Sequence, residues 1–180
     1  MLRNYLFRAI TVAALYAALN MSAQTTPWKQ FNYSDEGFAA SFPSAPSLEK
    51  KAVQTSAGEF ELRSYVVEAG DTSLFVGVCD YREATAEKTP DQLLLGAKKS
   101  MLANSGSRIL NEKKIALGPN PGVQFEAENS ATHFSARIFM VGSTLYEELV
   151  VSSLSKPYDR TAQFLDSFQL VSRTIHDPKN

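Results

Sequence analysis

TPDQLLLGAKKSMLANSG, residues 89–106, is the stretch in which the apolar period of this 180-residue chain changes from two to about 3.6. Thr89 can cap a helix, Pro90 suits the first helical position, and Gln92 occupies the third position of a capping box. Gly106 then supplies a stop, because glycine readily adopts the left-handed conformation that ends many helices. The sequence therefore predicts a helix that begins at Pro90 and ends before Gly106.

The predicted helix has an apolar face and a polar face. Residues three or four positions apart lie on one side of a helix, so its apolar residues form a stripe that should pack against the rest of the protein. This stripe consists of Leu93, Leu94, Ala97, Met101 and Leu102. Lys98 and Lys99 fall on the other side, where we expect solvent.

Short segments with β-branched or aromatic residues at period two lie on both sides of this helix. Those expected before it are residues 28–33, 38–42, 48–55, 59–68 and 72–81. Those expected after it are residues 108–117, 122–128, 133–141 and 144–152. A second helix is expected near Pro157, and a short strand at residues 169–171 precedes a frayed tail from about residue 172. Because strands follow strands with no βαβ alternation, we predict an α+β fold, a mainly antiparallel sheet flanked by about two helices.

Several core and turn segments have a pattern shared with a known superfamily. They are Gly37-Phe38-Ala39-Ala40-Ser41-Phe42-Pro43-Ser44-Ala45-Pro46, Pro121-Gly122, Arg137-Ile138-Phe139-Met140-Val141-Gly142, Leu145-Tyr146 and Phe164-Leu165-Asp166-Ser167-Phe168. Through them, residues 28–171 resemble the Mog1/PsbP-like superfamily, whose members include photosystem-associated and Ran-binding proteins. The resemblance implies a sandwich fold and a role in binding or assembly rather than in catalysis. No residue here matches a functional motif of either group, so the resemblance implies no site residues.

The first 23 residues have the composition of a secretory signal peptide. Arg3 and Arg8 precede an apolar run of about 11 residues, 9–19, and the segment contains no acidic residue. A membrane-spanning helix needs roughly 20 residues, so we expect no membrane span. We predict cleavage after Ala23, which leaves residues 24–180 as a single globular domain that is exported and is periplasmic or extracellular.

Composition and charge exclude several classes of function. The 18 basic and 19 acidic residues give a formal net charge of −1, which argues against nucleic acid or an anionic membrane surface as the partner. With one cysteine and two histidines, the chain cannot build a disulfide framework, a Cys-rich zinc site or an iron–sulfur cluster. The sequence contains no Gly-x-Ser-x-Gly elbow, phosphate-binding glycine loop or His-Glu-x-x-His motif, so we expect no cofactor and no enzyme activity. The cysteine, Cys79, lies in a strand-like run, where we expect a buried free thiol rather than a nucleophile.

A hairpin turn at Gly142-Ser143 sets the register of the two strands that it joins. Val141 should face Thr144 across this turn. Further along the strands, Arg137 should face Glu148 and form an ion pair with it on one side of the sheet. An aromatic pair from the same strands should lie on that side too.

The loop around Asn129-Ser130 leaves two registers open. A two-residue turn puts Glu126 opposite His133, whereas a four-residue turn puts Glu128 opposite His133. Either register places the same polar residues on one face, namely Gln124, Glu126, Glu128, His133, Ser135, Arg137 and Glu148. The other face is then apolar and contains Val123, Phe125, Phe134, Ala136, Ile138, Met140, Leu145, Leu149 and Val151.

The polar face has a functional interpretation and a structural one. A histidine between carboxylates can be a general base or a pH switch, and His133 with two glutamates could form part of a metal site. Alternating charges on a solvent-exposed sheet also contribute about 0.2–1 kcal/mol per pair and protect the register without any active site. We favour this second interpretation.

Two aromatic residues near the start of the predicted domain, Trp28 and Phe31, could leave rings partly exposed on an edge strand. This edge is the preferred surface for a partner. The leading hypothesis is a small exported, non-enzymatic binding or assembly module of the bacterial cell envelope, with a protein or an envelope component as its partner. The alternative is a small exported enzyme or metal-dependent protein that uses Glu126, His133, Arg137 and Glu148.

Overall fold

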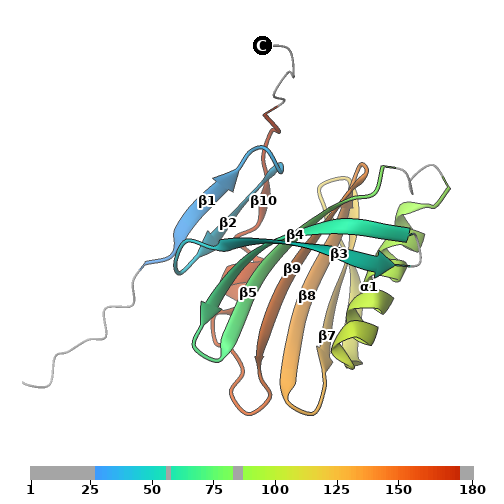
Figure 1. The fold of residues 1–180 in the computed structure, drawn as a ribbon. Helices are drawn as coiled ribbons and strands as arrows, with labels where there is room; N and C mark the ends of the chain where they lie inside the picture. Colours follow the sequence, from blue (N-terminus) through green and yellow to red (C-terminus); the bar gives the residue numbers. More distant parts are fainter. Residues whose placement is uncertain (1–26, 56–57, 83–86, 175–180) are drawn as a thin grey trace, which may run out of the picture.

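The computed structural model describes residues 27–55, 58–82 and 87–174. The strands are β1 (Lys29–Tyr33), β2 (Phe38–Phe42), β3 (Ser47–Thr55), β4 (Gly58–Ala69), β5 (Thr72–Asp80), β6 (Arg108–Leu117), β7 (Asn120–Glu128), β8 (Thr132–Val141), β9 (Thr144–Ser153) and β10 (Gln169–Leu170), and the helices are α1 (Pro90–Ser105) and α2 (Thr161–Leu165). A large antiparallel sheet has the order β3-β4-β5-β9-β8-β7-β6, and a small one has the order β1-β2-β10 (Figure 1). The predicted α+β class is confirmed, and the ends of the predicted strands move by at most two residues.

Helix α1 begins and ends where its sequence predicts. The Thr89 hydroxyl accepts a hydrogen bond from the Gln92 backbone N at 3.3 Å, and the Gln92 side chain accepts one from the Thr89 backbone N at 2.9 Å. The helix ends at Gly106, which has a φ of 61°. Lys98 departs from the prediction, because its side chain is only 12% exposed and its Nζ lies 2.5 Å from Glu112 Oε2. This ion pair ties the expected solvent side of α1 to β6.

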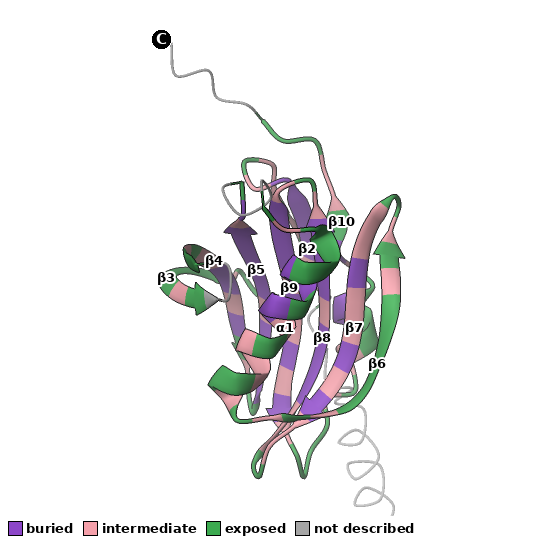
Figure 2. Ribbon diagram, turned by 90° about the vertical axis from the view of Figure 1, so that its right-hand side faces the viewer, coloured by how far each residue is buried: buried purple, intermediate pink, exposed green. Residues whose placement is uncertain are grey.

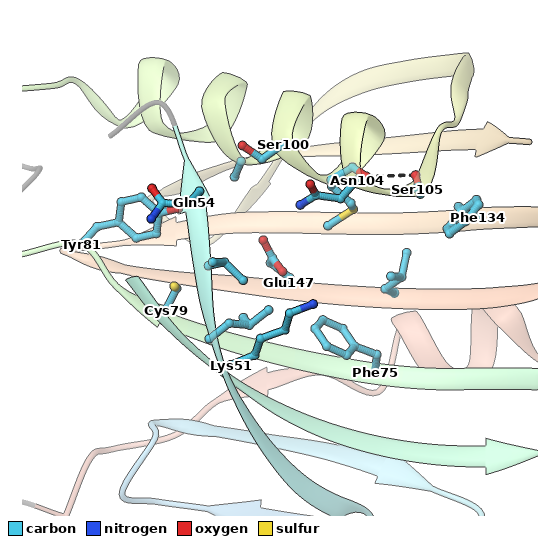
Figure 3. A pocket seen from close by; sticks show the side chains of 15 residues that line it. Lys51, Gln54, Phe75, Cys79, Tyr81, Ser100, Asn104, Ser105, Phe134 and Glu147 are labelled. Carbon is cyan, nitrogen blue, oxygen red and sulfur yellow. Dashed lines mark hydrogen bonds between the residues drawn. The ribbon is translucent and has the colours of Figure 1, made fainter. Parts of the chain in front are cut away.

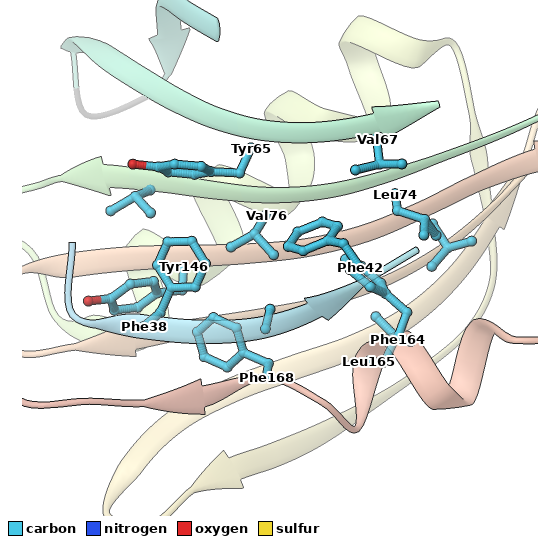
Figure 4. Packing of buried hydrophobic residues seen from close by; sticks show 13 residues of the cluster. Phe38, Phe42, Tyr65, Val67, Leu74, Val76, Tyr146, Phe164, Leu165 and Phe168 are labelled. Atoms are coloured by element: carbon cyan, nitrogen blue, oxygen red, sulfur yellow. The ribbon is translucent and has the colours of Figure 1, made fainter. Parts of the chain in front are cut away.

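The middle of the large sheet is covered on both faces, whereas its edge strands β3 and β6 are mostly exposed (Figure 2). Helix α1 packs on one face, where it contacts β3, β7 and β8. The buried residues on this face include the predicted Phe125, Phe134, Ala136, Ile138, Met140 and Leu145. The small sheet and α2 cover the other face, where Phe38, Phe42 and Phe164 pack into one cluster with Tyr65 and Tyr146 of the large sheet (Figure 4). The result is a three-layer sandwich with a core on each side of the large sheet.

The late strands pair in the predicted register. Val141 faces Thr144 across the Gly142 turn, which confirms the two-residue hairpin. In the preceding hairpin Glu128 faces His133, so the four-residue alternative is the one that forms. Asn129 closes this longer turn, because its Oδ1 accepts hydrogen bonds from the backbone N atoms of residues 131 and 132, both at 2.9 Å.

The C-terminal segment returns to the small sheet. Helix α2 begins at Thr161, later than the expected start near Pro157, and the Tyr158 carbonyl accepts hydrogen bonds from the backbone N and the hydroxyl of Thr161. Beyond α2, the backbone N of Ser41 donates to Ser167 Oγ at 2.9 Å, although 126 residues separate the two in sequence. The second layer therefore depends on contacts between the two ends of the domain.

The chain stays attached to the fold beyond residue 172, where we expected a frayed tail. Arg173 Nη2 donates to Thr144 Oγ1 at 2.9 Å. The backbone N of Thr174 donates to the Ser34 carbonyl at 3.1 Å. The last described residues are thus held by β9 and by the turn between β1 and β2.

Within the described ranges, no helix has both the length and the apolar character needed to cross a membrane. The predicted signal peptide at residues 1–23 lies outside the described residues.

Candidate functional site

Glu148 is buried, although the sequence analysis placed it on an exposed face. It is 1% exposed and lies on β9 between Tyr146 and Val150, which belong to the core beneath the small sheet. Its Oε2 atom has no hydrogen-bond partner among the described residues. Burial raises the pKa of this carboxyl well above its ordinary value, against the lowering effect of Arg137. The expectation of a solvated face is therefore wrong at Glu148, because a second layer covers this part of the sheet.

Arg137 faces Glu148 in the register but pairs with other groups. Its guanidinium donates to the Leu165 carbonyl and to Asp166 Oδ1, both at 2.8 Å, and to Gln124 Oε1 at 3.1 Å. The predicted ion pair between Arg137 and Glu148 does not form. Arg137 instead holds the end of α2 against the large sheet.

His133 is close to one of the predicted carboxylates. Its Nε2 lies 3.2 Å from Glu126 Oε2, which also accepts a hydrogen bond from Ser135 Oγ at 2.6 Å. Glu128, directly opposite His133, pairs with Arg108 instead. The His133 and Glu126 side chains are 26% and 23% exposed, so this group lies at the surface.

The predicted polar face is thus divided into two separate places. Arg137 lies four positions after His133 on β8, which corresponds to about 13 Å along a strand. The covered Glu148 lies at the Arg137 end. Across the part of the chain that the structure describes, no group of three or more His, Cys, Asp or Glu side chains could hold a metal ion.

The predicted aromatic edge contributes to the core beneath the small sheet. Phe31 lies on β1, the edge strand of that sheet, and Trp28 lies just before it. The Trp28 ring meets Phe164 edge to face at a centroid distance of 6.4 Å, and Phe31 meets Phe42 in the same way at 6.1 Å. Both rings remain half-buried, so they combine a packing role with a surface that a partner could contact.

We expect Trp28→Ala to lower the free energy of unfolding by about 1–2 kcal/mol, because the half-buried ring loses its contact with Phe164. Urea denaturation followed by circular dichroism measures this change. An unchanged unfolding midpoint would show that the Trp28 ring contributes nothing to the stability of the fold. Contact with a partner would then be the remaining role for this ring.

A pocket that the sequence analysis missed lies between α1 and the large sheet (Figure 3). Its volume is about 300 Å³. The apolar part of its lining includes Val53, Leu62, Phe75, Met101, Phe134 and Leu149. The polar part includes Lys51, Gln54, Ser100, Asn104, Ser105 and Glu147. Apolar walls with a few polar groups are typical of sites for small ligands.

Small residues on both sides leave the space for this pocket. Ala97 and Ser100 are the small α1 residues in its middle turns, and Met101, Asn104 and Ser105 line it further along the helix. On the sheet, Glu147 faces Gly77, which carries no side chain. A Cβ atom at Gly77 would come within 2.7 Å of the Phe75 ring, so this ring occupies the space beside Gly77. The Phe75 ring and Glu147 both line the pocket at this point of the sheet.

Glu147 is the acidic residue of this pocket. It lies in the apolar row of β9, between Leu145 and Leu149, and this single charged residue was the signal that could have revealed the pocket. Its carboxylate accepts no hydrogen bond and forms no ion pair with any described residue. Burial raises the pKa of the Glu147 carboxyl from 4.5 to about 7. Lys51 reaches into the same pocket from β3 without pairing with it (Figure 3).

Cys79 also lines the pocket, and it is a buried free thiol as predicted. Its Sγ donates a weak hydrogen bond to the Glu61 carbonyl at 3.4 Å. Burial raises the pKa of the thiol to about 12, with a further contribution from the Glu147 charge. The thiolate that a nucleophilic cysteine requires is therefore disfavoured here.

No protein-family model matches the sequence, and no curated protein matches it. Its fold is similar to the solution structure of cyanobacterial PsbP (CyanoP) from Synechocystis sp. PCC 6803, with a TM-score of 0.56 and 11% sequence identity. The match covers 81% of this chain and 93% of the cyanobacterial chain. At this level of identity the likeness concerns the fold and not the function. The protein therefore has a PsbP-like fold, as its core and turn segments predicted.

Proposed function

We propose that this protein is a small exported, non-enzymatic binding module of the bacterial cell envelope, and that it binds a small, largely apolar ligand or a side chain of a partner in the pocket under α1. The observation that carries the proposal is the pocket itself, a space of about 300 Å³ with apolar walls and one unpaired carboxyl. Sites for small ligands are typically concave and mostly apolar with a few polar groups, and this pocket has that composition.

The chemistry of the pocket favours binding over catalysis. Its thiol, Cys79, is neutral and hydrogen-bonds only to a backbone carbonyl among the described residues. Along β8, His133 alternates with Phe134, which lines the pocket, so His133 points to the opposite face of the sheet. Glu126 pairs with Ser135, which lies on the same face as His133, and it therefore also faces away from the pocket. The residues of the alternative enzyme hypothesis thus do not supply a base to this thiol.

Filling the pocket tests the proposal. We expect Ser100→Leu to abolish saturable binding of 1-octanol, because the added side chain would occupy the space beside Ala97. NMR titration of the protein with 1-octanol measures the binding through shifts at pocket residues. The matched control is Lys99→Leu, which adds the same side chain at the neighbouring exposed position of α1.

Two results would contradict the proposal. One is that 1-octanol causes no saturable shifts at Leu149 or Met101, which line the pocket. The other is that Ser100→Leu binds 1-octanol as the parent protein does. A thermal denaturation midpoint for each variant shows that the protein is folded.

A further inference from the structure

We propose that the pocket under α1 selects ligands with a primary ammonium group on a short apolar body, and that Glu147 receives the ammonium group. This inference rests on the proposed function, because it names the class of ligand for the same pocket.

The position of Glu147 is the first reason. Its neighbours in the sheet are Gly77 on β5 and Ile138 on β8, and its row on β9 continues with Leu145 and Leu149. A carboxyl among such residues is costly to bury unless an opposite charge or a hydrogen-bond donor compensates for it. No described side chain does so. A cation or donor on a ligand would supply the missing partner.

The other groups around the pocket decide the sign of the ligand charge. Helix α1 contributes the uncharged Ser100, Asn104 and Ser105, and β5 contributes the neutral Cys79 thiol. The other titratable groups of the lining are the Tyr81 phenol and the Lys51 ammonium. Lys51 is exposed and comes from the edge strand β3, where water can solvate its charge. Glu147 is therefore the less exposed of the two charged residues in the lining, and it favours a cation.

The size of the pocket limits the ligand. A volume of about 300 Å³ corresponds to roughly ten water molecules at about 30 Å³ each. A ligand with roughly ten non-hydrogen atoms would fill it, such as an alkylamine with eight carbons. The apolar walls would contact the hydrocarbon chain, while the ammonium group would reach Glu147.

Proton linkage gives the proposal a pH dependence. In the empty pocket the pKa of Glu147 is about 7, so below that pH the carboxyl is largely protonated and must lose a proton before it can pair with an ammonium ion. The apparent affinity for an alkylammonium ion should therefore fall about tenfold between pH 8 and pH 6. A neutral alcohol needs no such ionisation, and its affinity should not fall over the same range.

The experiment compares octylamine, 1-octanol and octanoate by NMR titration at pH 6 and pH 8. For the parent protein we expect octylamine to bind most tightly at pH 8. For Glu147→Gln we expect its affinity to fall at least tenfold, while the affinity for 1-octanol stays the same or rises. Glu68→Gln is the matched control, since it makes the same change at an exposed position of β4.

The other possible outcomes distinguish a failure of this inference from a failure of the proposed binding function. Equal affinities for octylamine and 1-octanol, or an unchanged octylamine affinity in Glu147→Gln, would overturn the inference and leave the binding function standing. Tighter binding of octanoate would also overturn it and would assign the charged contact to Lys51. Absence of binding for all three compounds would contradict the proposed function itself.

Discussion

Phe38→Ala is expected to lower the free energy of unfolding by about 3–5 kcal/mol. Phe38 lies on β2 between the two sheets and is fully buried. Its ring packs against those of Tyr33 and Tyr65 at centroid distances of 5.0 and 5.2 Å, and it stacks on Phe168 at 5.7 Å. Its removal would leave a cavity where the small sheet, the large sheet and the C-terminal segment meet. Such a loss is large compared with the 5–15 kcal/mol that stabilises a typical domain.

Urea denaturation followed by circular dichroism measures the effect of Phe38→Ala. Leu48→Ala is a useful control, because Leu48 is 51% exposed and its truncation should change the free energy of unfolding by no more than about 0.5 kcal/mol. A loss below about 1 kcal/mol for Phe38→Ala would mean that the small sheet does not unfold together with the large one.

The free energy of unfolding is expected to fall as the pH rises from about 5 to 8. The Glu147 carboxyl has a pKa of about 7 in the folded protein and about 4.5 in the unfolded chain, so between these values the folded state binds more protons. The contribution of the Glu147 carboxyl to the free energy of unfolding is fully present below about pH 4.5 and is lost as the pH rises through about 7. The loss from Glu147 is on the order of 2–3 kcal/mol at about 1.4 kcal/mol per pKa unit, and Glu148 acts in the same direction.

Urea denaturation at pH 5, 6, 7 and 8 measures this profile. We expect the double variant Glu147→Gln, Glu148→Gln to flatten it, because neither amide ionises in this range. Glu68→Gln, on an exposed position, should keep the slope of the parent protein. A parent protein that becomes more stable towards pH 8, or a double variant with the original slope, would show that these buried carboxyls do not control the profile.

The site could be predicted only in part. The two-residue turn at Gly142-Ser143 correctly placed Arg137 opposite Glu148 and Val141 opposite Thr144. It did not reveal that α2 takes the Arg137 guanidinium away from Glu148. Glu147, the acidic residue of the pocket, was visible in the sequence as a charged residue in an apolar row, but the row alone does not say that a cavity lies above it.

The sequence by itself determined the local structure. The limits of α1 follow from the Thr89 cap and from Gly106, and the register of the β8–β9 hairpin follows from the Gly142 turn, because each signal acts over a few neighbouring residues. Only the tertiary structure decided what covers each face of the large sheet. The cover over the part of β9 that holds Glu148 comes from β2 and α2, which belong to opposite ends of the domain, and the pocket is lined jointly by α1 and by β3, β4, β5, β8 and β9. Alternation specifies which residues share a face, but the layer that packs on that face is set by contacts between distant segments.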